Sequence, residues 1–229
     1  MKLLLFDLDG TLVATGGAGV RALNRAIFQV SGISNAMDGI RPHGKTDPAI
    51  VREVFTLRGN SGFSPETIGQ ILEAYVEFLS EEVRQSPSYR ILPGIVRFLE
   101  DFHGRHDLAL GLATGNIERG ARIKLARGDL NRFFAFGGFG SDSESRTALV
   151  CRAAEQGARH IGRSVSRDDV FVIGDTPRDI DAGREAGFRT VGVATSDYTI
   201  EDLEAAGADF VLSDFERDRD QFLRMARIV

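Results

Sequence analysis

A short apolar run near the N-terminus ends in two carboxylates, and this junction constrains the fold more than any other stretch. Leu3-Leu4-Leu5-Phe6 is typical of a strand buried on both faces, and Asp7-Leu8-Asp9-Gly10-Thr11 follows it at once. A buried strand that releases acidic side chains delivers them to the carboxyl edge of a sheet, where open α/β folds bind ligands. The junction therefore predicts an α/β sheet with a polar site at the end of its first strand.

The two acids of this junction are expected to act together. Side chains alternate along an extended chain, so Asp7 and Asp9 project from one face while Leu8 points into packing. Two like charges this close repel, and a hard, oxygen-binding cation such as Mg²⁺ would offset the repulsion. Gly10 permits a tight turn, and Thr11 adds a hydroxyl and an N–H for a bound phosphate. The alternative is a plain Asp-Gly turn that ends a strand.

A second buried strand, expected from Leu108 to Ala113, ends in the polar triplet Thr114-Gly115-Asn116. Backbone N–H groups at a strand-to-helix turn can hold phosphate oxygens, and the Thr114 hydroxyl is a further donor. The triplet is therefore a candidate phosphate site. The alternative is an ordinary helix cap.

A third buried strand, Val170-Phe171-Val172-Ile173, leads through a glycine to Asp175. Asp175 follows the strand directly and is the predicted metal ligand. Asp179 lies in the first turn of the next helix, where Thr176 and Pro177 give it the spacing of a capping box. Asp179 is therefore either a ligand or a group that caps its own helix, and the sequence leaves both open.

The rest of the chain predicts two parts. Residues 15–87 carry apolar side chains at helical spacing, with one helix opening at Asp47-Pro48, where Asp47 is the expected N-cap, and another at Ser64-Pro65. Consecutive helices do not extend a parallel sheet. From residue 88 strands and helices alternate, as in βαβ units. We therefore expect a Rossmann-like, doubly wound parallel core from 1–14 and 88–229, with an inserted all-α cap at 15–87.

The three strand ends resemble the first, second and fourth motifs of the haloacid dehalogenase superfamily. Asp7-Leu8-Asp9-Gly10-Thr11 matches the first motif at every specified residue. The resemblance implies that Asp7 is the nucleophile and Asp9 the general acid and base of phosphoryl transfer. The true dehalogenases lack the second acid, so its presence points to phosphate chemistry. The resemblance also implies that Thr114 binds the transferred phosphoryl group, and that Asp7, Asp175 and the Asp9 carbonyl hold Mg²⁺.

The third motif of the superfamily, normally a lysine between the second and fourth, is not matched. The chain has only three lysines, Lys2, Lys45 and Lys124, and we expect none of them to serve as this residue. Arg146, at the start of a helix, takes the expected position. A guanidinium can bridge the Asp7 carboxylate and a phosphate oxygen as an ammonium does. The alternative is a surface arginine.

Three potential cations, Arg41, His43 and Lys45, precede the helix expected at Asp47-Pro48 in the cap. A helix N-terminus with cations beside it favours a bound anion. Because the core would hold the phosphate, these side chains would bind the other end of the substrate. A carboxylate at that end would suit them best. The alternative is that Asp47 only caps the helix and the cations lie in solvent.

Composition excludes several classes of function. The 229 residues are 42% hydrophobic, enough for one core and a modest insert, and the net charge of −5 gives no basic surplus for nucleic acid. A single cysteine, Cys151, permits no disulfide within the chain and fits a reducing compartment. The N-terminal apolar run is too short for a signal peptide, and no segment has membrane-spanning length. We expect a cytoplasmic monomer or homodimer without a membrane partner.

The overall pattern resembles the phosphoglycolate phosphatase branch of the superfamily. That resemblance implies an Mg²⁺-dependent phosphatase that acts on a small phosphorylated metabolite through an aspartyl phosphate. Three alternatives remain. A phosphomutase would share every core residue, and a phosphonate-cleaving enzyme would need Lys45 to form a Schiff base. A non-catalytic regulatory protein is the third, although Asp7, Asp9, Thr114 and Asp175 are all intact.

Overall fold

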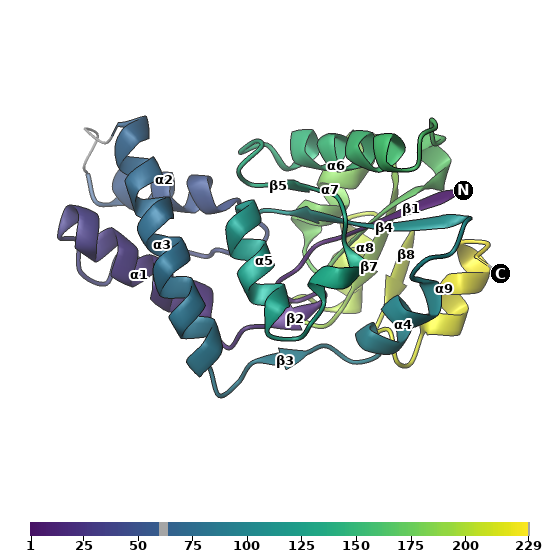
Figure 1. The fold of residues 1–229 in the computed structure, drawn as a ribbon, viewed down its shortest axis with the longest axis horizontal. Helices are drawn as coiled ribbons and strands as arrows, with labels where there is room; N and C mark the ends of the chain where they lie inside the picture. The colour runs from purple at the N-terminus through teal and green to yellow at the C-terminus, as the bar shows by residue number, and fades with distance from the viewer. Residues whose placement is uncertain (60–63, 229) are drawn as a thin grey trace.

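In the computed structural model, which describes residues 1–59 and 64–228, six parallel strands form one sheet (Figure 1). The chain winds outward from a central first strand in both directions, so the order is that of a doubly wound Rossmann-like sheet. The prediction of the core architecture is confirmed. Across the sheet the strands are β5 (Gly137–Phe139), β4 (Leu108–Thr114), β1 (Lys2–Phe6), β6 (Val170–Gly174), β7 (Arg189–Val193) and β8 (Phe210–Leu212).

Strand β1 is buried on both faces because its side chains alternate between two hydrophobic clusters. Leu4 and Phe6 enter one cluster, whereas Leu3 and Leu5 enter the other. Burying one such side chain contributes about 1.5–3 kcal/mol, so the run specifies a central position in the sheet. Helices cover both faces. The first cluster lies under α4 (Ile95–Phe102), α5 (Glu118–Ala126) and α9 (Arg219–Met225), and the second under α6 (Arg146–His160) and α7 (Pro177–Glu185), with α8 (Ile200–Ala205) beside α7.

Three further helices lie to one side of the sheet (Figure 1) and pack around a hydrophobic cluster of their own. They are α1 (Ala18–Ser31), α2 (Asp47–Leu57) and α3 (Pro65–Gln85). The helices expected in this segment are therefore present, while its limits at 15 and 87 stay a prediction. Within the described part of the chain, no helix is both long and apolar enough to span a membrane.

Two short strands join the helical segment to the core. β2 (Val13–Ala14) and β3 (Arg90–Ile91) pair antiparallel, so the chain leaves and re-enters the core at one place. The Ser86 hydroxyl donates to the Thr15 carbonyl at 2.8 Å, which holds together the two chain segments that connect the helices to the core. Neither strand was predicted, because two residues are too few to show a period.

The start of α2 corrects one prediction. Thr46, not Asp47, is the N-cap, and its side chain accepts a hydrogen bond from the Ala49 N–H. Asp47 is the first helical residue, and its carboxylate accepts the Ile117 N–H of the core at 2.8 Å. The Asp47 side chain therefore binds across the boundary between the helices and the core. The Ser64-Pro65 start of α3 was predicted correctly.

Candidate active site

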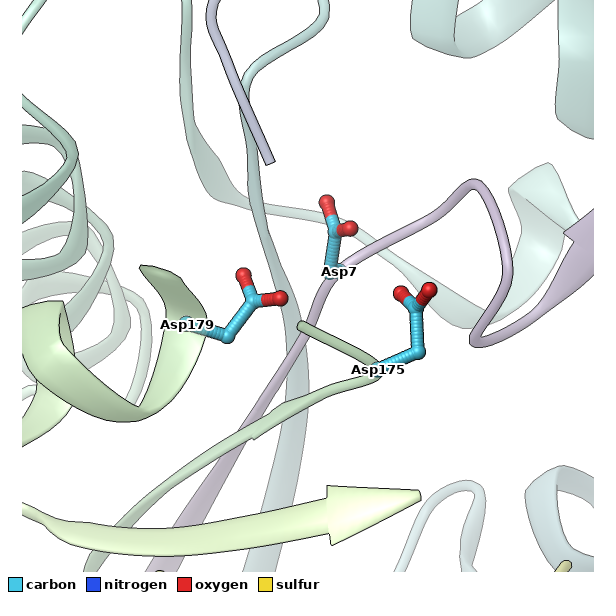
Figure 2. Close-up of side chains that lie close together, drawn as sticks. All are labelled: Asp7, Asp175 and Asp179. Carbon is cyan, nitrogen blue, oxygen red and sulfur yellow. The ribbon is translucent and has the colours of Figure 1, made fainter. Parts of the chain in front are cut away.

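Three buried carboxylates converge at the carboxyl edge of the sheet (Figure 2). Asp7 follows β1, Asp175 follows β6, and Asp179 comes from the first turn of α7. One oxygen from each lies within 4.8 Å of the others. The turn after β1 needs a glycine, because Gly10 has a φ of +83° and a methyl group there would lie 2.2 Å from Asp175 Oδ2.

The electrostatics of this cluster call for a cation. Burial raises the pKa of Asp7 to about 7, and the charge of Asp179 adds to the effect while Arg146 opposes it. Burial and the charge of Asp7 also raise the pKa of Asp175. Asp7 Oδ1 is buried and has no hydrogen-bond partner. Three carboxylates and one guanidinium leave an excess of negative charge, so these oxygens fit a hard divalent cation.

Arg146 lies beside the carboxylates, at the first residue of α6. Its Nη2 is 3.6 Å from Asp7 Oδ1 and forms a hydrogen-bonded ion pair with Asp179 Oδ1. Burial disfavours the charged guanidinium, but the carboxylates of Asp179 and Asp7 raise the pKa of Arg146 nonetheless. Arg146 is thus a buried cation within reach of a group bound at Asp7.

Asp179 combines the two roles that the sequence left open. Its Oδ2 accepts from the Thr176 N–H at 3.1 Å and from the Thr176 hydroxyl at 2.7 Å, which caps α7. Its Oδ1 pairs with Arg146, and one Asp179 oxygen belongs to the carboxylate cluster. One oxygen therefore fixes the helix while the other binds Arg146.

The triplet Thr114-Gly115-Asn116 begins at the last residue of β4 and lies at the same carboxyl edge of the sheet. The Asn116 N–H and Nδ2 donate to Thr114 Oγ1 at 3.3 and 2.9 Å, so the Thr114 hydroxyl hydrogen remains available to a bound oxygen. A methyl at Gly115 would lie 2.2 Å from the Lys45 carbonyl, so only glycine permits this approach of the helical segment. Thr11 differs from expectation, because its hydroxyl donates to Asp175 Oδ1 at 3.1 Å. Thr11 therefore supports a carboxylate.

Asp9 is bound by a different set of partners from the three clustered carboxylates. Its Oδ2 accepts from Lys124 Nζ at 2.5 Å and from Asn116 Nδ2 at 2.9 Å. Lys124 lies on the buried face of α5 and is only 4% exposed. The sequence assigned Lys124 no role at this site, so its contact with Asp9 is a finding of the structure. Its sequence signal was a lysine at the helical spacing of Ala121 and Leu125.

A pocket of about 290 Å³ lies over these groups, between the core and the helical segment. His43 and Lys45 line it, but each faces an acid: Lys45 pairs with Glu53, and His43 Nδ1 is 3.3 Å from Asp197. Arg41 is exposed and is not among the residues that line the pocket. The apolar side chains that line the pocket include Val13, Val20, Leu23, Ile50 and Tyr75.

Asp47 fixes the helical segment to the loop that follows β4. Its N–H donates to the Gly115 carbonyl at 2.8 Å, and its carboxylate accepts the Ile117 N–H. Burial raises the pKa of Asp47 to about 6, although the charge of Lys124 and the Ile117 hydrogen bond oppose the rise. A titratable side chain therefore lies at the contact between the two parts.

Known proteins resemble this chain over most of its length. A sequence model for haloacid dehalogenase-like hydrolases matches residues 4–193. A phosphoglycolate phosphatase of Agrobacterium fabrum is 30% identical over 227 residues, covering 93% of this chain and 88% of that protein. One of Synechococcus elongatus is 27% identical over 216 residues, covering 93% and 92%. The crystal structure of a hydrolase from Pseudomonas syringae has a TM-score of 0.75 and 26% identity, covering 98% of this chain and 99% of its own.

Proposed function

Because the chain belongs to the haloacid dehalogenase-like hydrolases, we propose that it is an Mg²⁺-dependent phosphatase that hydrolyses a small phosphate monoester through an aspartyl phosphate on Asp7. Relatives named phosphoglycolate phosphatase support a phosphoric monoester hydrolase. One observation carries the mechanism: Asp7 presents a buried oxygen without a hydrogen-bond partner, beside Arg146, at the carboxyl edge of the sheet. Such an oxygen is free to attack the phosphorus of a phosphate group bound beside Arg146.

In the first half of the reaction an Asp7 oxygen attacks phosphorus and the bond from phosphorus to the ester oxygen breaks. Asp9 gives its proton to the departing alkoxide. Arg146 and the Thr114 hydroxyl stabilise the charge on the phosphoryl oxygens. The products are an alcohol, which leaves, and a phosphorylated Asp7.

In the second half a water molecule attacks the phosphorus of the aspartyl phosphate. Asp9, now ionised, takes a proton from that water, and the bond between phosphorus and the Asp7 oxygen breaks. Inorganic phosphate leaves, Asp7 is free, and Asp9 is protonated again. One water is consumed for each ester cleaved.

The carboxylates of Asp7, Asp175 and Asp179, with the Asp9 carbonyl, would hold the metal ion. Bound Mg²⁺ would neutralise the charge of the phosphate and of these carboxylates. The fit rests on the oxygen-only donor set, the unpartnered Asp7 Oδ1 and the raised pKa values of Asp7 and Asp175.

The substrate that we favour carries a carboxylate, as phosphoglycolate does. Lys45 and His43 line the pocket, where a substrate carboxylate could bind. The relatives from Synechococcus elongatus and Agrobacterium fabrum are named phosphoglycolate phosphatase. A phosphonate-cleaving reaction is less well supported, because Schiff-base chemistry needs a neutral amine and Lys45 is in an ion pair with Glu53. The cytoplasmic location stays a prediction.

The test is phosphate release from a panel of small monoesters, with Mg²⁺ and with chelator. We expect release that depends on Mg²⁺ and disappears in the chelator, with phosphoglycolate among the better substrates. Full activity in the chelator would exclude the metal site. A phosphorus-NMR time course with a hexose phosphate separates a mutase, which moves the phosphoryl group to another hydroxyl, from a phosphatase, which releases it.

A further inference from the structure

Lys124 is a buried ammonium whose hydrogen-bonded partners include the candidate acid and base. Its Nζ donates to Asp9 Oδ2 at 2.5 Å and to Asn116 Oδ1 at 2.6 Å, and Asn116 Nδ2 donates to the same Asp9 oxygen at 2.9 Å. The three side chains therefore form a closed ring of hydrogen bonds. A ring of this kind fixes the direction of the carboxylate more firmly than either donor alone.

The ring uses one oxygen of Asp9 and leaves the other to the pocket. Among the described residues, none donates a hydrogen bond to Asp9 Oδ1. The Asp9 side chain keeps 38% of its surface exposed, and Asp9 lines the pocket. Lys124 thus binds the back of the carboxylate, and Oδ1 is the oxygen available for proton transfer.

Helices α1 and α3 close over the ammonium group. A methyl added at Gly19 of α1 would lie 3.5 Å from Lys124 Nζ and 3.7 Å from the Tyr75 hydroxyl of α3. With the side chain only 5% exposed, solvent does not compensate the charge, so the ion pair with Asp9 is costly to break. The helical segment therefore encloses the contact that orients Asp9.

We propose that Lys124 is a positioning residue for Asp9: together with Asn116 it holds the carboxylate by Oδ2, so that Oδ1 faces the reacting oxygen in both halves of the reaction. The inference rests on the proposed function, in which Asp9 is the acid and base. The Asn116 amide also links Asp9 to Thr114, because its Nδ2 donates to both Asp9 Oδ2 and Thr114 Oγ1. Loss of Lys124 would leave the nucleophile intact and impair the steps that need Asp9.

The experiment replaces Lys124 by methionine, which keeps the length of the stem and removes the charge and the donors. With p-nitrophenyl phosphate the leaving group needs little help from an acid, so phosphorylation of Asp7 stays fast while the hydrolysis of the aspartyl phosphate slows. We expect kcat to fall about 10- to 100-fold and KM to fall with it, so that kcat/KM for p-nitrophenyl phosphate stays within about threefold of the wild type. A burst of p-nitrophenolate near one per active site should precede the slow steady state.

Two comparisons make the result specific. Lys2→Met is the matched control, since Lys2 pairs with Asp169 at the opposite end of β1, and it should keep wild-type kinetics. In an Asp9→Asn background Lys124→Met should cause no further loss, because the group that it positions is gone. This double variant removes both members of the Lys124–Asp9 ion pair, so it remains informative if Lys124→Met alone folds poorly.

An equal loss of kcat in the Asp9→Asn background would overturn the proposal, as would wild-type kinetics in Lys124→Met. A rise in KM without a fall in kcat would overturn it in favour of substrate binding by Lys124. Failure of the proposed function itself is distinct, because then neither the wild type nor Lys2→Met releases phosphate from any monoester.

Discussion

The core side and the cap side of the pocket differ in how far the charges of their side chains are compensated. On the core side, Asp7 and Asp175 follow buried parallel strands, and burial, with the charges of neighbouring carboxylates, raises the pKa values of both. On the cap side, Lys45 and His43 come from a loop, where Lys45 forms an ion pair with Glu53 and His43 Nδ1 lies 3.3 Å from Asp197. The carboxylates of the core therefore favour a bound cation, while on the cap side the charge of Lys45 is compensated by Glu53.

This contrast predicts that the largest losses of activity come from the core. Asp7→Asn removes the nucleophile, and we expect kcat for p-nitrophenyl phosphate to fall about 10⁴-fold or more. The matched control is Asp181→Asn, the same change at an exposed carboxylate on α7. The Asp7 variant must be checked by mass for deamidation. Activity near the wild-type level in intact Asp7→Asn protein would remove the nucleophile assignment.

Within the core, replacement by asparagine should have different effects at Asp175 and at Asp179. The pKa of Asp175 is raised, so its ionised form costs stability at neutral pH when no metal is bound. Asp175→Asn should raise the Mg²⁺ concentration required for activity by about tenfold or more, and should not destabilise the metal-free protein. Denaturant unfolding with and without Mg²⁺, alongside metal titrations of activity, measures both effects.

Asp179→Asn should instead destabilise the protein. Thr176 donates twice to one oxygen and Arg146 to the other, so an amide must turn its NH₂ group toward a donor on one side. We expect a loss of about 1–3 kcal/mol in the free energy of unfolding. If both asparagine variants unfold alike, the division of roles between Asp175 and Asp179 is wrong.

The positions of the core residues could be predicted from the sequence, because they follow from local patterns along buried strands. Buried runs such as Leu3 to Phe6 and Val170 to Ile173 identify central strands, and parallel strands bring their carboxyl ends to one edge. The positions of Asp7, Asp175 and Thr114 therefore follow from local patterns. Arg146 was also placed correctly, because it opens the helix after β5.

Contacts between distant segments were not predictable in this way. The spacing of Lys124 shows only that it faces inward on α5, while its partner Asp9 lies 115 residues away. Thr46 and Asp47 are both good helix caps, and the choice depends on the Ile117 N–H of the core, which takes the Asp47 carboxylate. Helices α8 and α9 were missed because six or seven residues give too little periodicity.

The contact between the cap and the core should depend on pH. The pKa of Asp47 in the folded protein is about 6, above its usual 3.8, so the unfolded chain loses this proton first and stability falls as the pH rises through this range. Asp47→Asn cannot ionise. The variant should match the wild type below pH 4 and exceed its stability near pH 7 by at most about 3 kcal/mol.

Denaturant unfolding at a series of pH values tests this prediction. Asp38→Asn, at an exposed position of the same segment, is the matched control and should show a difference that does not vary with pH. A pH-independent difference for Asp47→Asn as well would mean that Asp47 is not buried as an acid at the contact with Ile117.

The smallest expected effects belong to the cap cations. Lys45 is paired with Glu53 and Arg41 does not line the pocket, so their contribution to recognition of a carboxylate should not exceed about 1 kcal/mol, or about fivefold in kcat/KM. The measurement compares phosphoglycolate with an uncharged phosphate ester of similar size. Lys45→Ala should lower the preference for the carboxylate, and Arg41→Ala should leave it unchanged.

Glu53→Gln sharpens the test, because it leaves Lys45 in place and removes the acid that compensates its charge. If the ion pair with Glu53 weakens the interaction of Lys45 with a substrate carboxylate, this variant should increase the preference for phosphoglycolate. Lys45→Ala should have the opposite effect. A preference that is unchanged in both variants would show that the cap cations do not read the substrate. Selectivity would then have to come from the shape of the apolar part of the pocket, formed by residues such as Leu23 and Ile50.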